Sequence, residues 1–64
     1  MKLISVAGTW FQVEMSQREL LIFNAALNEI CNGIEVFEFQ SRIGAQREEV
    51  ARLLSEVGQL LDKA

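Results

Sequence analysis

Residues 39–54 read FQSRIGAQREEVARLL, and this stretch decides how the chain is expected to fold. Phe39 and Ile43 have helical spacing, Gly44 stands where a tight turn is needed, and apolar residues recur at helical spacing beyond it. Two helices joined at an angle by a turn that contains glycine form a helix-turn-helix. The sequence therefore predicts a short helix that ends at Gly44 and a long helix over about residues 46–63.

A well-marked helix start precedes this motif. Ser16-Gln17-Arg18-Glu19 matches a capping box, in which the serine oxygen accepts a backbone N–H and the glutamate bonds back to the cap. Apolar residues then recur at helical spacing as far as Asn32-Gly33. Because glycine adopts the left-handed conformation found just after many helices, Gly33 is the expected end of this first long helix.

Residues 2–15 alternate in the manner of β-strands. With Gly8-Thr9 as a two-residue hairpin loop, Val6 pairs with Phe11 and Ile4 pairs with Val13 on one face. The other face then carries Leu3, Ser5, Ala7, Trp10, Gln12 and Glu14. Because a lone two-stranded hairpin is only marginally stable in water, we expect it to pack on the helices.

Residues 36–43 leave two structures open. Val36-Phe37-Glu38-Phe39 has the β-branched and aromatic content of a strand, whereas the spacing of Val36, Phe39 and Ile43 favours a short helix. With the helix preferred, the predicted fold is α+β: a single domain over residues 1–64, with an N-terminal β-hairpin followed by a long, a short and a long helix. The expected core consists of Ile4, Val6, Phe11, Val13, Leu20, Phe23, Leu27, Ile30, Phe39, Ile43, Val50, Leu53, Leu54, Val57 and Leu61.

Composition limits how so short a chain can be stabilised. Half of the 64 residues are hydrophobic, and nine acidic against six basic residues give a net charge of -3. Domains of this size usually need disulfides, a metal or a partner subunit, but Cys31 is the only cysteine and there is no histidine. Association is therefore the expected remedy. No run approaches the roughly 18 apolar residues of a membrane span, and we expect a cytoplasmic protein of bacterial type.

Catalysis and DNA binding both find little support in the sequence. The chain has no histidine or tyrosine for acid–base chemistry and no glycine-rich phosphate loop, so we expect no enzyme activity, no cofactor and no metal. Affinity for DNA depends on Lys and Arg that meet phosphates, whereas glutamates accompany the arginines of the helix-turn-helix. Nucleic acid is therefore a disfavoured partner, and a dimeric DNA-binding regulator stays as an alternative hypothesis.

The leading hypothesis is a small non-enzymatic protein-binding module, such as an inhibitor or immunity-type partner of a larger basic protein. An acidic surface complements such a target and speeds their encounter. The candidate partner-binding residues are Trp10, Gln12, Glu14, Asn24, Asn28, Glu48, Glu49 and Arg52. The asparagines could instead bond within the chain. A purely structural assembly subunit is a further alternative, and without a foreign partner we expect a homodimer joined through the hairpin or the last helix.

Two segments carry a resemblance to known sequences. Residues 27–34 read LNEICNGI and residues 37–44 read FEFQSRIG, followed by a leucine-rich acidic helix. Together they resemble a group of small uncharacterised bacterial single-domain proteins, over residues 16–62. The resemblance implies a helical fold behind a short β segment and brings no activity with it.

Overall fold

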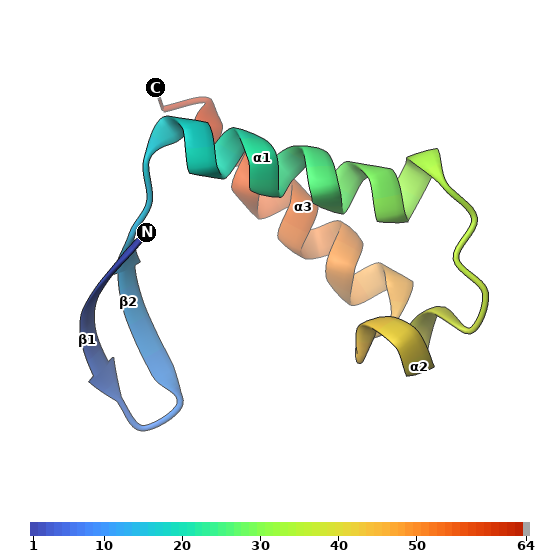
Figure 1. The fold of residues 1–64 in the computed structure, drawn as a ribbon, viewed down its shortest axis with the longest axis horizontal. Helices are drawn as coiled ribbons and strands as arrows, with labels where there is room; N and C mark the ends of the chain where they lie inside the picture. The colour runs from blue at the N-terminus through green and yellow to red at the C-terminus, as the bar shows by residue number, and fades with distance from the viewer. Residues whose placement is uncertain (64) are drawn as a thin grey trace.

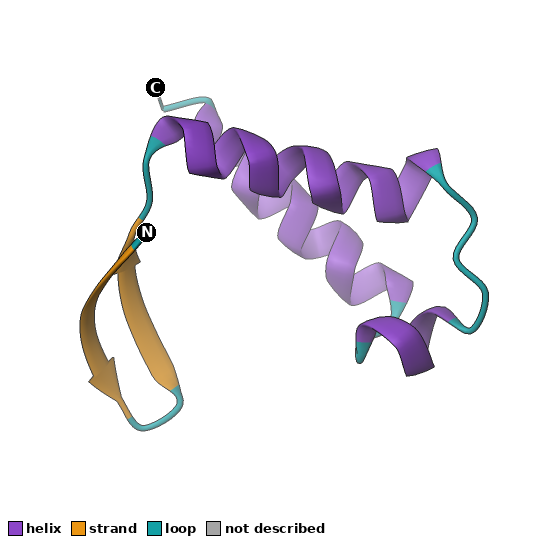
Figure 2. Ribbon diagram, in the orientation of Figure 1, coloured by secondary structure: helices purple, strands orange, loops and turns teal. Residues whose placement is uncertain are grey.

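A computed structural model describes residues 1–63, in which a β-hairpin extends away from a layer of helices (Figure 1). The elements in chain order are β1 (Lys2–Ala7), β2 (Trp10–Glu14), α1 (Gln17–Asn28), η1 (Glu29–Gly33), α2 (Phe39–Ile43) and α3 (Arg47–Leu61). Figure 2 shows the strands and the helices as separate parts, joined by one short connection. The predicted α+β fold, with a hairpin followed by a long, a short and a long helix, is confirmed.

The start of α1 is the predicted capping box. The Ser16 Oγ accepts a hydrogen bond from the Glu19 N–H at 3.1 Å, and the Ser16 N–H donates to the Glu19 carboxylate at 2.9 Å. These two bonds satisfy backbone donors that the first turn of a helix otherwise leaves free. The same carboxylate accepts a hydrogen bond from the amino group of Met1, which ties the beginning of β1 to α1.

The end of this helix differs from the prediction. The chain continues from α1 into the wide π turn of η1, and the Ile34 N–H donates to the Glu29 carbonyl at 2.8 Å. Gly33 is not in the left-handed conformation that the sequence suggested for it. The longer i to i−5 bond already satisfies the Glu29 carbonyl, so a left-handed glycine cap is not required there.

α2 is shorter than predicted, and the strand alternative for residues 36–39 is wrong. Glu38 adopts a left-handed conformation with φ 51° and accepts the first helical bond from the Arg42 N–H, so the helix begins only at Phe39. Gly44 is left-handed with φ 85°, and its N–H donates to the Gln40 carbonyl at 2.8 Å. The turn predicted at Gly44 is therefore present, because glycine takes this conformation without steric cost.

The core lies where α1 crosses α3, which runs in the opposite direction (Figure 1). Leu27 of α1 meets Val50 and Val57 of α3, and these are the buried apolar residues of the described chain. Around them pack the partly buried Leu20, Ile30, Cys31, Phe39, Ala45, Leu54 and Leu61. Eight of the expected core positions are therefore correct.

The other expected core residues are exposed: Ile4, Val6, Phe11, Val13, Phe23, Ile43 and Leu53. The first four belong to the hairpin, which extends away from the helices instead of packing on them (Figure 1). Phe23 and Leu53 have the spacing of the apolar stripes, three residues after Leu20 and Val50. They are nevertheless exposed, and each lines a shallow groove at the surface. Ile43 closes the short α2 and gains no cover there.

The hairpin has a register that the sequence analysis did not predict. Val6 pairs with Phe11 as expected, but a bulge at Ile4 makes Leu3, not Ile4, the partner of Val13. A bulge inserts one unpaired residue and shifts the faces of the residues beyond it. Leu3 consequently joins Val6, Phe11 and Val13 on one face instead of lying opposite them.

The molecule is more extended than its length requires. Its radius of gyration is 13.1 Å, against about 11 Å for a compact chain of this length. Its accessible surface of 5282 Å² exceeds by about 1,200 Å² the surface of a folded monomer of this mass. The hairpin accounts for this shape, since every residue of both strands is exposed.

The cap of α1 gives the protein a pH dependence that can be measured. Hydrogen bonds from the Met1 amino group and from the Ser16 backbone hold the pKa of Glu19 below its ordinary value. A group with a depressed folded-state pKa stabilises the fold above its ordinary pKa, and this contribution is lost as the pH falls through the folded value. We therefore expect urea midpoints of Glu19→Gln to fall less than those of the wild type on acidification.

Glu35→Gln is the matched control, because it removes one carboxylate from the loop after η1 and leaves the cap intact. It should keep the acid dependence of the wild type. Equal acid dependence in the wild type and Glu19→Gln would show that the cap carboxylate contributes nothing to it.

Candidate protein-binding surfaces

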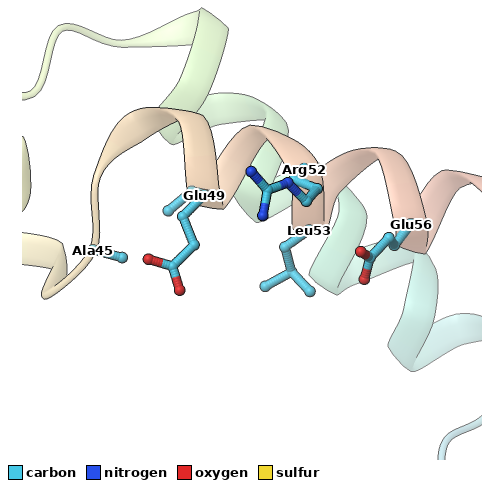
Figure 3. A pocket seen from close by; sticks show the side chains of 6 residues that line it. Ala45, Glu49, Arg52, Leu53 and Glu56 are labelled. Atoms are coloured by element: carbon cyan, nitrogen blue, oxygen red, sulfur yellow. The ribbon is translucent and has the colours of Figure 1, made fainter.

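A shallow groove runs along the outer side of α3. Its apolar floor is formed by Ala45, Val50 and Leu53, and its volume is about 280 Å³. Figure 3 shows Glu49 and Leu53 projecting in the same direction from the helix. Such a groove lies below the usual size of a site for a drug-sized molecule, but it is large enough for one or two apolar side chains of a protein.

Three charged side chains border this groove: Glu49, Arg52 and Glu56 (Figure 3). They sit at positions i, i+3 and i+7, which share one side of a helix with Leu53. Two carboxylates against one guanidinium make the rim acidic. An apolar side chain flanked by lysine or arginine on a partner protein would match both the floor and the rim.

The groove contains two of the eight predicted partner-binding residues, Glu49 and Arg52, and excludes Glu48. Glu56 belongs to the groove, and the sequence analysis missed it. The signal that could have found it is its spacing, since it lies seven residues after Glu49 and four after Arg52. Grouping acidic residues by helix face, not by closeness in sequence, would have included it.

The two predicted asparagines, Asn24 and Asn28, have different surroundings. The Asn32 side-chain amide donates to the Asn28 side-chain oxygen at 3.0 Å, so Asn28 bonds within the chain across one helical turn. Asn24 is half-buried on α1, one turn earlier. The structure therefore does not join these residues to the groove on α3.

The hairpin candidates share one face of the hairpin. Trp10 pairs with Ala7, Gln12 with Ser5 and Glu14 with Lys2, and residues directly opposite each other share a face. The Ser5 hydroxyl donates to the Gln12 side-chain oxygen at 3.1 Å. We call this side the polar face (Lys2, Ser5, Ala7, Trp10, Gln12, Glu14) and the opposite side the apolar face (Leu3, Val6, Phe11, Val13).

The arginines of the helix-turn-helix segment are dispersed. The Arg47 guanidinium donates to the Cys31 carbonyl at 2.9 Å and lies 4.6 Å from the centre of the Phe39 ring. Arg52 follows five residues later on α3, about 140° around a helix with 3.6 residues per turn, and borders the groove. Arg42 belongs to α2. The three arginines therefore do not form one continuous row.

A second shallow groove of about 320 Å³ lies where the hairpin joins α1. Its lining is mostly apolar, from Met1, Met15, Ile22, Phe23 and Ala26, with Glu19 at its side. Within residues 1–63, no three His, Cys, Asp or Glu side chains come together in a way that would hold a metal ion.

Comparisons of the chain with protein-family models, with curated proteins and with solved structures find no match. The resemblance of residues 16–62 to small bacterial proteins therefore stays a prediction. None of the helices in residues 1–63 has the length and apolar character needed to cross a membrane.

Proposed function

We propose that this protein is a non-enzymatic binding module that attaches to a larger basic protein through the groove on α3, as an inhibitor or immunity-type partner would. The observation that carries the proposal is an apolar floor, formed by Ala45, Val50 and Leu53, with the carboxylates of Glu49 and Glu56 beside it. Protein interfaces combine apolar contact at the centre with a polar rim, and the groove reproduces this arrangement on a small scale.

The charge of the chain supports a basic partner. The net charge is -3, and complementary charge accelerates the encounter of two proteins and disfavours wrong partners. The dispersed arginines support a protein target over a nucleic acid, because phosphate binding relies on several cations that meet the backbone together.

The test is capture of the partner from the native host with purified wild-type protein and two charge-reversed variants. Glu49→Lys places a cation on the groove rim and should weaken binding by about tenfold or more. Glu48→Lys is the matched control, since it reverses the same charge in the same first turn of α3 but lies outside the groove. It should retain the partner.

Two outcomes would contradict the proposal. If no protein were recovered in stoichiometric amount, the chain would not be a protein-binding module. If Glu49→Lys and Glu48→Lys weakened partner binding equally, binding would depend on the overall charge and not on the groove. A mobility shift with duplex DNA at low salt that disappears steeply as salt rises would instead support the regulator hypothesis.

A further inference from the structure

The apolar face of the hairpin has no cover in the described chain. Phe11 is 66% exposed, and Leu3, Val6 and Val13 beside it are also exposed. Two strands on their own are marginally stable in water, and strands gain stability when one face is covered. The hairpin is therefore amphipathic, and no element within residues 1–63 covers its apolar face.

We propose that the apolar face is the interface with a second copy of this chain, in a symmetric dimer that brings the two hairpins together. This inference concerns a surface apart from the α3 groove and does not depend on the proposed function. A two-fold interface uses the same patch on both copies, so four apolar side chains from each hairpin would cover one another.

The area available agrees with a dimer. The chain exposes about 1,200 Å² beyond a folded monomer of its mass, and a stable protein interface buries about 800 Å² on each partner. The excess surface is concentrated in the hairpin, since both strands are exposed over their whole length. This excess includes both faces of the hairpin, so an interface on the apolar face would bury part of it and bring the molecule closer to the normal range.

Charge places the second copy on the hairpin and not on α3. Two acidic chains that met along α3 would bring Glu49 and Glu56 of one copy near carboxylates of the other, and like charges repel. The apolar face has no charged side chain, because Lys2 and Glu14, which lie opposite each other in the strand register, are both on the polar face. Two copies can therefore meet on this face without bringing charged side chains of the face together.

Analytical ultracentrifugation over a wide concentration range tests the proposal. The wild type should have twice the mass of its 7.2 kDa chain at high concentration and dissociate on dilution, with an unfolding midpoint that rises with protein concentration. Val6→Ser and Phe11→Ser should each halve the mass. Trp10→Ser is the matched control, because Trp10 is larger and more exposed (81%) but lies on the polar face, and it should stay dimeric.

A second measurement avoids variants whose hairpin fails to form. In a mixture of isotope-labelled and unlabelled wild-type chains, intermolecular contacts should appear between the Phe11 ring and the methyl groups of Val6 and Val13. A wild type that is monomeric at every concentration would overturn the proposal. So would a dimer whose intermolecular contacts involve Leu53 or Leu60 of α3 and leave the apolar face free.

Discussion

Leu27→Ala is expected to lower the free energy of unfolding by about 2–5 kcal/mol, which is most or all of the stability of a domain of this size. Leu27 is the buried residue that α1 contributes to a core otherwise made by Val50 and Val57 of α3. Truncation removes its contacts with both valines and leaves a cavity that few neighbours can fill. Urea unfolding followed by circular dichroism should show a lost or strongly lowered midpoint.

Leu21→Ala is the control for this experiment. It makes the same chemical change on the same helix, at a position that is exposed. Substitutions of this kind usually change stability by no more than about 0.5 kcal/mol. If the two variants unfolded at the same urea concentration, the crossing of α1 and α3 would not be the centre of the core.

Phe39→Ala is expected to lower the free energy of unfolding by about 2 kcal/mol, less than the 3–5 kcal/mol of a fully buried phenylalanine. Phe39 is half-buried against the core, and its ring lies under the Arg47 guanidinium. A cation over an aromatic ring contributes about 0.5–1 kcal/mol at exposed sites. Urea midpoints should therefore place Phe39→Leu, which keeps apolar area and loses the ring, between the wild type and Phe39→Ala.

Phe37→Ala provides the comparison, since Phe37 lies two residues earlier and is 71% exposed. Its replacement should leave the midpoint almost unchanged. Equal effects of the two alanine variants would mean that α2 is not held to the rest of the protein through Phe39.

The elements that sequence reasoning predicted correctly depend on local signals. The capping box at Ser16 and Glu19 needs only four consecutive residues, and the turn at Gly44 needs one residue with access to positive φ. The apolar spacing of α3 likewise identified Val50, Leu54, Val57 and Leu61 as core, because one helix face meets the same partner along its length.

The incorrect predictions concern features that depend on distant parts of the molecule or on unfavourable conformations. The bulge at Ile4 has no local marker, so the alternation of apolar residues predicted a regular register. Glu38 takes a left-handed conformation that a glutamate rarely adopts. Nothing in the sequence therefore indicated that α2 begins as late as Phe39. Apolar alternation in the hairpin predicts a covered face but cannot tell whether the cover belongs to the same molecule.

The groove on α3 was predictable only in part, because its residues carry local signals but its shape depends on the packing of neighbouring elements. Glu49 and Arg52 were predicted because they are charged residues near the start of the last helix, and the same criterion also selected Glu48, which lies outside the groove. The groove itself exists because neighbouring elements leave Ala45 and Leu53 accessible at the surface. The spacing of apolar residues in the sequence does not predict that accessibility. Trp10 was selected for its residue type, whereas its surroundings on the polar face follow only from the register of the strands.

The joint contact of Arg47 with the Cys31 carbonyl and the Phe39 ring has a consequence for evolutionary variation. A planar guanidinium can donate to a carbonyl and stack flat on a ring at the same time, whereas a lysine ammonium has no planar face with which to stack. Homologous sequences should therefore conserve an aromatic residue and an arginine eight positions apart, and should lose them together. That paired substitution pattern would identify distant relatives whose overall sequences have diverged.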